Sequence, residues 1–447
     1  MPILLKTKFS YQLVKYFTCL MPIIFCFFVF LTDNVNYNDL FELRKYSATS
    51  KYWLGDLDQE YSVGRLPIYP IFIFIVYKIF GIDNYNALIF FQAILGFFSF
   101  LYLIKILEEL NLSKNLIILA TIFMNFSMLF RFSVFLPNCF FIFFLIISIY
   151  FLTKFFKSNQ IKHFIIFCLI FAILLLTRPI FQFTIFLTIP LIIFYIYKSK
   201  VSFKFIMILS LLASYISGVG IQILRNYNFD KSILYTSQSG HHSMWIVACL
   251  SKKYACGTRD MEVFDYISNK SEEKILNSTN KNLEQQNKIR ISVTKEYILE
   301  NFSFNQFIFS VFFSYLKVIF HSSLIEIYGA FDLEASALYS SGENNLLGKL
   351  KNIFNSALSN PLILFWLISI FTITILRTIQ IYGMVVGLKD KKKRIYVAII
   401  SSMAFLIFIT TVGLGNPRYR SEMEPLLIIL GAIGIDRLYK KFSKKKF

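Results

Sequence analysis

Charged residues are scarce in this sequence. Only 16% of the 447 residues are Asp, Glu, Lys or Arg, whereas 56% are hydrophobic and 53 are Phe. Soluble domains carry more charge and a smaller apolar share, so this composition excludes an ordinary soluble protein. Several windows are long and apolar enough to cross a bilayer. The sequence therefore predicts an all-α, polytopic membrane protein.

Nucleotide-binding and zinc-binding motifs are also missing. The chain has no Walker motif, no dinucleotide fingerprint and no spacing of Cys and His that is typical of a zinc site. These absences argue against ATP-driven transport and against an organic cofactor. Only six cysteines are present. Cys249 and Cys256 share a long segment after residue 225, where oxidising conditions would allow a disulfide between them.

Acidic residues are outnumbered, which leaves a net charge of +20. A basic chain can bind nucleic acid, but here Lys and Arg gather in short tracts beside apolar windows. This distribution is typical of the cytoplasmic loops of membrane proteins. We therefore expect membrane lipids, and no nucleic acid, among the partners.

About ten segments are predicted to span the membrane. The first follows Lys6 and Lys8 and has no small-residue cleavage site, so it is predicted to be retained. Two further apolar segments, 67–81 and 307–329, are short or interrupted by charge, and are predicted to lie as helices along the outer surface. The predicted spans are 12–32, 86–107, 115–136, 139–156, 162–177, 179–197, 203–224, 361–387, 395–414 and 425–438.

The basic tracts decide the orientation of these spans. With ten spans, the tracts at 154–162, 198–204 and 389–394 and the Lys-rich tail all fall on the cytoplasmic side. Any chemistry on a water-soluble group is then expected on the outer side. The predicted parts of the chain are a transmembrane core with a first outer loop (1–224, loop 33–65), an extracytoplasmic segment with interfacial helices (225–360), and carboxy-terminal spans with a basic cytoplasmic tail (361–447).

The first outer loop is rich in acids and ends in a basic residue. Carboxylates at the rim of a membrane can serve as general bases or as metal ligands. The loop closes on Arg65 beside Pro67 and Pro70, which restrict the chain that follows. Its acids are Asp33, Asp39, Glu42, Asp56, Asp58 and Glu60.

Four short motifs follow one another along the chain. The acidic loop ends in GRLPIYPIF (64–72), and LLLTRPIFQF (174–183), RNYNF (225–229) and GNPRYRSEMEPLLIIL (415–430) come later. Their order resembles the GT-C membrane glycosyltransferases, in particular the bacterial glycosyltransferase family 39 type, which is related to protein mannosyltransferases and the lipid A aminoarabinose transferase. The resemblance implies a GT-C-like fold in the bacterial cytoplasmic (inner) membrane, with an active site that faces the extracytoplasmic side.

The resemblance also implies a reaction. A hexosyl or pentosyl group would move, with inversion, from a polyprenyl-phosphate donor to a lipid, glycan or protein acceptor. An acid of the first outer loop would act as the base, and Asp39 matches this position best, with Asp33 as the alternative. Arg65 would meet the donor phosphate. Relatives carry an acid in the second outer turn, where this chain has Asn138, which cannot act as a base. The use of a divalent cation therefore stays open, and no metal ligand is assigned.

Arginines at the outer ends of spans suit the phosphate of such a donor. Guanidinium groups grip phosphate oxygens in pairs and remain charged. Arg178, Arg418 and Arg420 are assigned to the donor phosphate together with Arg65. In the motif at 415–430, Arg418 and Arg420 would point to opposite sides of an extended chain. We expect one to face the phosphate and the other to pair with Glu422 or Glu424.

Weaker assignments and alternatives remain. Tyr419, Asn138, Arg225 and Trp245 are candidate substrate-binding residues, the last because an indole ring can stack on a sugar. A transporter or flippase for a lipid-linked saccharide would place ionisable residues deep inside several spans. An O-antigen-like polymerase would act outside on lipid-linked sugars with similar arginines. Both alternatives stay open at the level of sequence.

Overall fold

The computed structural model of this chain is built of helices throughout the parts it describes. These parts are residues 8–32, 40–56, 65–132, 137–230, 235, 239–251, 261–278, 282–320, 360–410 and 420–443. No β-strand occurs within these ranges, so the predicted all-α class is confirmed. The elements are α1 (Lys8–Thr32), α2 (Leu40–Trp53), α3 (Ile68–Phe80), α4 (Tyr85–Glu109), α5 (Lys114–Met128), η1 (Leu129–Phe132), α6 (Asn138–Ser158), α7 (Ile161–Leu175), η2 (Pro179–Ile185), α8 (Thr188–Lys198), α9 (Lys204–Asp230), α10 (Ser239–Ser251), α11 (Met261–Leu276), α12 (Leu283–Asn301), α13 (Phe304–Phe320), α16 (Pro361–Lys389), α17 (Arg394–Thr410) and α19 (Glu424–Ser443).

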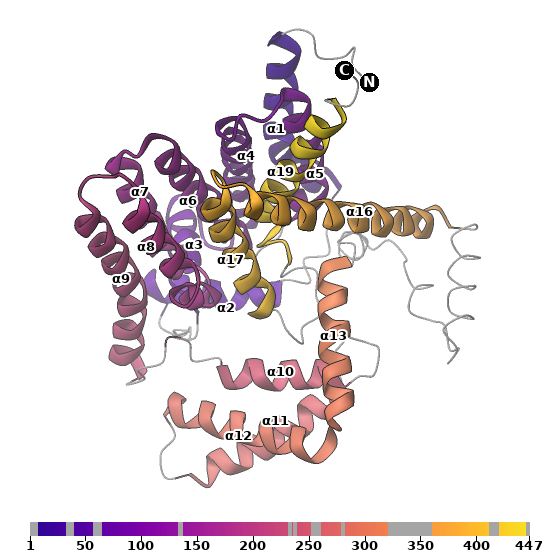
Figure 1. The fold of residues 1–447 in the computed structure, drawn as a ribbon. Helices are drawn as coiled ribbons and strands as arrows, with labels where there is room; N and C mark the ends of the chain where they lie inside the picture. Colours follow the sequence, from indigo (N-terminus) through magenta and orange to yellow (C-terminus); the bar gives the residue numbers. More distant parts are fainter. Residues whose placement is uncertain are drawn as a thin grey trace.

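The helices form a main bundle and a smaller group. In Figure 1, α10, α11 and α12 lie together, and α13 runs from them towards α16. The small group has its own core of Met244, Val247, Ile267 and Val293. The other helices pack into the main bundle, where the carboxy-terminal α17 and α19 contact elements from the first half of the chain.

Several helices meet the length and hydropathy needed to cross a membrane. Five described helices do so by themselves, namely α1, α4, α6, α9 and α16. The bent pair η2 and α8 makes a sixth candidate. The prediction of an integral membrane protein is thus supported, while the number of ten spans stays a prediction. The remaining predicted spans coincide with the shorter helices α5, α7 and α17 and with α19.

The predicted interfacial segment at 67–81 forms the short helix α3. Its 13 residues extend about 20 Å, well below the roughly 30 Å of a hydrocarbon core. One face, with Tyr69, Ile73 and Val76, is buried, whereas Lys78 is exposed near its end. α3 packs against α2 and α4. Its length and the exposed Lys78 agree with a helix that does not cross.

Asparagine side chains begin three of the helices. The Asn84 side chain accepts a hydrogen bond from the backbone N–H of Ala87 (3.1 Å), and Asn282 caps α12 in the same way. At α16, the Asn360 side chain accepts from the N–H of Leu362 (2.9 Å), and Pro361 occupies the first helical position. Such caps satisfy amide groups that lack a partner within the helix. They explain why α16 begins where the apolar run begins.

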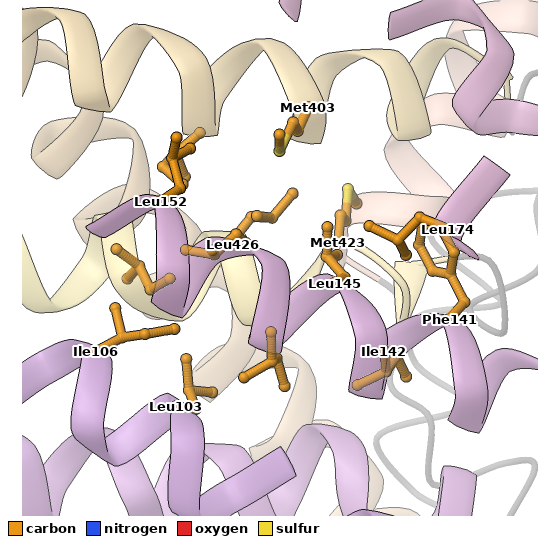
Figure 2. Close-up of a cluster of buried hydrophobic side chains, with 14 of the residues drawn as sticks. Leu103, Ile106, Phe141, Ile142, Leu145, Leu152, Leu174, Met403, Met423 and Leu426 are labelled. Carbon is orange, nitrogen blue, oxygen red and sulfur yellow. The ribbon is translucent and has the colours of Figure 1, made fainter. Parts of the chain in front are cut away.

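A core of large apolar side chains joins the two ends of the chain. Figure 2 shows Met423, just before α19, beside Leu145 of α6, with Leu426 of α19, Met403 of α17 and Leu103 of α4 in the same cluster. All five side chains are buried. In lipid, helices associate mainly by close packing, because the hydrocarbon tails are as apolar as the side chains. This packing fixes the start of α19 against the first turns of α6.

Glycines allow α16 and α19 to approach each other closely. A Cβ atom on Gly383 would lie 1.9 Å from the carbonyl oxygen of Leu430, and one on Gly434 would lie 2.7 Å from the carbonyl oxygen of Ile379. Both distances are far below van der Waals contact. Small residues at a helix crossing are the usual means by which membrane helices bring their backbones together.

Replacing Gly383 with Ala is expected to push α19 away from α16. The added methyl group meets backbone, which cannot move aside as a side chain can, so we expect a loss of about 1–3 kcal/mol. Thermal unfolding of the purified protein in detergent measures the effect. Gly220→Ala in α9 is the matched control, because nothing lies within 4 Å of its added Cβ. Equal melting temperatures for the two variants would contradict the crossing.

Candidate active site

The described part of the carboxy-terminal motif is charged and yet buried. Arg420 is 2% exposed, Glu422 is 0% exposed and Glu424 is 2% exposed. Charged groups are rarely buried to this extent unless opposite charges and hydrogen bonds surround them. The partners of these three side chains therefore define the site.

Glu422 holds two residues that the sequence analysis assigned to the substrate. Its Oε1 atom lies 2.6 Å from Nη2 of Arg178, and it accepts a hydrogen bond of 2.8 Å from Nδ2 of Asn138. Asn138 is fully buried, whereas the Arg178 side chain keeps 16% of its surface exposed. The carboxylate thus fixes a guanidinium that still reaches the surface. Such a group is suited to an anionic ligand.

Local sequence explains why Arg178 and Asn138 reach this point. Arg178 precedes Pro179, which favours an extended conformation, and its backbone is indeed extended (φ −142°, ψ 130°). The chain therefore breaks between α7 and η2, and the Arg178 side chain reaches the buried Glu422 from this break. Pro137 precedes Asn138 and begins α6. Both side chains are placed by prolines at the ends of elements.

Glu424 lies between two arginines. Arg377 of α16 contacts it through both terminal nitrogens: Nη2 pairs with Oε1, and Nη1 donates to Oε2 at 3.2 Å. Nε of Arg420 lies 2.8 Å from Oε1 of Glu424. Nη1 of Arg377 also donates to the Gln380 side chain at 2.5 Å. In the described structure, Arg420 is therefore the arginine of the motif that pairs with a carboxylate.

A second basic group gathers around Arg65. Its Nη1 donates to the hydroxyl of Tyr46 (3.3 Å), and its guanidinium carbon lies 4.8 Å from the centre of the Tyr46 ring. Arg225, at the far end of α9, donates from Nη2 to the backbone carbonyl of Arg65. Two of the predicted arginines, 160 residues apart in sequence, are thus in direct contact.

Aromatic rings connect this group to α6. The ring centres of Tyr46 and Tyr69 lie 5.1 Å apart, and those of Tyr69 and Phe140 lie 5.7 Å apart. Phe140 is in the first turn of α6, which also carries Asn138. The Tyr69 hydroxyl donates to Gln92 of α4 (2.8 Å). The first turn of α6 therefore links the group of Arg65 and Arg225 to the group of Asn138, Glu422 and Arg178.

Trp245 lies in another part of the protein. It belongs to α10, where its Nε1 donates to Nε2 of His241 (2.6 Å) and its ring packs against Phe264. These contacts lie within the α10–α12 group. Four predicted site residues, Asp33, Asp39, Arg418 and Tyr419, fall outside the described residues.

Arg377 is a site residue that the sequence analysis missed. It is the only charged residue in the apolar run 361–387, and it is 6% exposed in the structure. A lone arginine in such a run is costly unless it is paired, and this cost was the signal that could have identified it. Its partner, Glu424, is 47 residues away, which sequence alone does not reveal.

Metal ligands are not grouped in the described residues. Among these residues, no set of three or more His, Cys, Asp or Glu side chains is arranged to hold a metal ion. Asp33, Asp39 and the acids at 57–60 lie outside the described residues. The use of a divalent cation therefore stays open. Cys249 is buried and Cys256 lies outside the described residues, so a disulfide between them stays a prediction.

Comparison with known families finds a match over a region that carries part of these groups. Residues 65–219 match the model of the dolichyl-phosphate-mannose-protein mannosyltransferase family. The match covers about a third of the chain and includes Arg65, Asn138 and Arg178. The resemblance predicted from the motifs is confirmed, and the match supports a membrane glycosyltransferase of the GT-C type. Comparison with curated proteins gave no significant match.

Proposed function

We propose that this membrane glycosyltransferase takes a hexosyl or pentosyl group from a polyprenyl-phosphate donor. The observation that carries the proposal is the family match over 65–219, because the family is named for a sugar linked through phosphate to a polyprenyl lipid. The transfer is proposed to occur with inversion, on the extracytoplasmic side of a bacterial cytoplasmic membrane. The acceptor would be a lipid, a glycan or a protein.

The arginines supply what such a donor needs. A polyprenyl phosphate keeps its tail in lipid and its phosphate at the interface, so its site requires cations at the end of a bundle of apolar helices. Arg178 is partly exposed and is oriented by the buried Glu422. Negative charge builds up on the donor phosphate as its bond to the sugar breaks, and cations that are already oriented lower the barrier. Arg178 and Arg65 are the described residues to which we give this role.

The reaction needs one base and one leaving group. Asp39, or Asp33 in its place, accepts the proton of the acceptor hydroxyl. The acceptor oxygen attacks the anomeric carbon, and the bond from that carbon to the phosphate oxygen breaks. Polyprenyl phosphate leaves with the electron pair. Because attack and departure occur on opposite faces, one displacement inverts the anomeric carbon.

Asn138 is given a supporting role. Its side-chain nitrogen donates to Glu422, and its Oδ1 atom is buried and has no hydrogen-bond partner among the described residues. An amide cannot remove a proton at neutral pH, but its oxygen can accept a hydrogen bond from a hydroxyl. We propose that Asn138 orients a hydroxyl group of the sugar or of the acceptor.

Purified full-length protein in lipid nanodiscs tests the function. Incubation with synthetic polyprenyl-phosphate sugars and envelope glycolipids should release polyprenyl phosphate and glycosylated product, detected by mass spectrometry. In a deletion strain, the lipid-linked sugar donor should accumulate. Lengthening of a glycan that remains on its lipid carrier would indicate the polymerase alternative. Movement of the intact donor across vesicles without product would indicate a flippase.

Cysteine labelling tests the proposed orientation. In a chain without native cysteines, single cysteines at the exposed positions 158 and 391 should react only with membrane-permeant maleimides in intact cells. A cysteine at the exposed position 242 of α10 should react with an impermeant reagent. The positive-inside distribution of Lys and Arg is the physical reason for this expectation. Labelling of position 158 by the impermeant reagent would contradict the proposed orientation.

Lysine substitutions separate the two arginines of the motif. Since Arg420 is held by Glu424, we propose that Arg418 faces the donor phosphate. Arg418→Lys keeps the charge but loses the paired donors, so kcat/KM for the donor should fall about ten- to a hundredfold, the scale of hydrogen bonds to charged groups. Arg420→Lys should mainly lower the melting temperature. Near-normal donor kinetics in Arg418→Lys would remove that residue from the site.

A further inference from the structure

Two guanidinium groups close the carboxy-terminal end of α13. Nε of Arg377 donates to the carbonyl oxygen of Ile319 at 3.2 Å. Nη1 of Arg420 donates to the carbonyl oxygens of Val318 and Ile319, both at 3.3 Å. Arg377 of α16 and Arg420 of the carboxy-terminal motif thus both hold the last described turn of α13 by hydrogen bonds to its backbone.

The same two arginines share one carboxylate. Glu424 pairs with both, so the group of Arg377, Arg420 and Glu424 carries a formal charge of plus one. All three side chains are buried. Together, the carbonyl oxygens of Val318 and Ile319 accept hydrogen bonds from both of these cations. Charged donors make such bonds stronger than those between neutral groups, so they tie α13 to this buried group.

α13 connects the small helical group to this point. Phe302, just before α13, packs against the core of α10–α12, and its ring centre lies 6.3 Å from that of Phe307. Further along, the Tyr315 ring packs on Phe408 of α17 at 4.6 Å. Figure 1 shows α13 extending from the α10–α12 group to α16. One end of α13 thus belongs to the small group, and the other ends on the arginines.

We propose that Arg377 is a positioning residue that couples the α10–α12 group to the carboxy-terminal motif. Arg377 lies near the middle of α16 and touches both α13 and the first residue of α19. Glu422, which orients Arg178, lies two residues before Glu424. A displacement of α10–α12 is therefore passed through α13 and Arg377 to the residues that hold Arg178. This inference rests on the proposed function only in its effect on turnover.

The coupling has a consequence for substrate recognition. Under the proposed function, an acceptor that contacts the α10–α12 group changes the position of α13. Because the arginine group fixes the end of α13 to the start of α19, acceptor binding would favour the arrangement in which Arg178 faces the donor. Loss of Arg377 should therefore reduce kcat more than it raises the KM of the donor.

Hydrogen exchange on the full-length protein in nanodiscs tests the coupling without any substrate. Arg377→Gln is chosen because Glu424 and Arg420 still balance each other, so the chain keeps a neutral buried pair. Amides in the last turn of α13 and in 420–426 are expected to exchange about tenfold faster, the scale of one lost hydrogen bond to a charged group. Arg290→Gln is the matched control, because Arg290 also pairs with a glutamate across helices (Glu272, 2.9 Å) but lies within the small group.

The outcomes separate coupling from a local role. Faster exchange in both segments and also in α10–α12 supports the coupling, whereas faster exchange confined to the two segments that Arg377 itself contacts, or wild-type exchange at the end of α13, overturns it. Arg377→Lys, made in parallel, keeps the charge beside Glu424 but cannot reach Ile319 and Gln380 together, so it should show the same pattern if Arg377→Gln does not fold. Should the wild-type chain prove inactive on polyprenyl-phosphate donors, the proposed function fails while the exchange result still stands. In an active chain, a kcat equal to wild type in both variants would also overturn the inference.

Discussion

Replacing Asp39 with Asn is expected to slow sugar transfer at least about a hundredfold, the usual scale for losing a general base. Asparagine has nearly the same size and still accepts hydrogen bonds, so the chain should fold and bind its donor as before. α2 begins at the next residue, Leu40, and its side chains Leu43 and Tyr46 are buried, which ties this part of the chain to the bundle. Steady-state kinetics with a polyprenyl-phosphate sugar provide the measurement.

Two further variants make this result interpretable. Asp33→Asn tests the alternative base, and Asp56→Asn changes an acid at the other end of the loop, after α2. Only one of Asp33 and Asp39 should be essential if a single base activates the acceptor. Full activity of Asp39→Asn together with an inactive Asp33→Asn would move the role to Asp33. Activity in both would exclude Asp33 and Asp39 as the base.

The helices could be predicted from sequence because lipid imposes a simple rule. Every backbone group must be satisfied inside the hydrocarbon layer, so a long apolar run is almost always a helix. The runs 86–107, 139–156 and 361–387 accordingly lie within α4, α6 and α16, each extended by a few residues. The predicted span 162–177 extends beyond the end of α7 at Leu175, because Thr177 and Arg178 are no longer helical before Pro179. Polarity therefore predicted most helix ends, and proline moved this one.

The arginines of the site were predictable in kind but their partners were not. Arg178 and Asn138 stand out because a polar side chain at the end of an apolar run needs a reason. Their common partner, Glu422, lies 284 residues after Asn138, and no local pattern brings the two together. The packing of Met423 and Leu426 against α6 does so. The site is thus assembled by the apolar core of the bundle.

The motif at 415–430 illustrates the same division. Spacing predicted that one of its arginines would pair with Glu422 or Glu424, and the structure pairs Arg420 with Glu424. Spacing did not reveal that Glu422 would pair with Arg178 or that Arg377 would pair with Glu424. The contact between Arg377 and Glu424 depends on how α16 crosses α19 at Gly383, and the contact between Glu422 and Arg178 depends on how the motif meets the break between α7 and η2. Charge pairs between distant segments follow from helix packing, which a single sequence does not specify.

Glutamine in place of Glu424 is expected to destabilise the protein more than glutamine in place of Glu422. The two carboxylates lie two residues apart in one motif and are equally buried, so each variant is a control for the other. Glu424→Gln leaves Arg377 and Arg420 together without a negative charge. Both are nearly inaccessible, at 6% and 2% exposed, and cannot turn to water or lipid headgroups. Breaking a buried pair in this way costs about 3–5 kcal/mol.

Glu422→Gln leaves a different situation. Its charged partner is Arg178, which keeps 16% of its side chain exposed and can turn towards the surface, while Asn138 can still donate to the new amide oxygen. The loss should be about 1–3 kcal/mol, as for a hydrogen bond to a charged group. Thermal unfolding of both variants in the same detergent measures the difference, and an equal or smaller loss in Glu424→Gln would contradict the buried cluster of Arg377, Arg420 and Glu424. Arg178 loses its fixed orientation in Glu422→Gln, so this variant should turn over its donor about tenfold more slowly, again the scale of one charged hydrogen bond. Glu422 is thus expected to matter for catalysis although its effect on stability is modest.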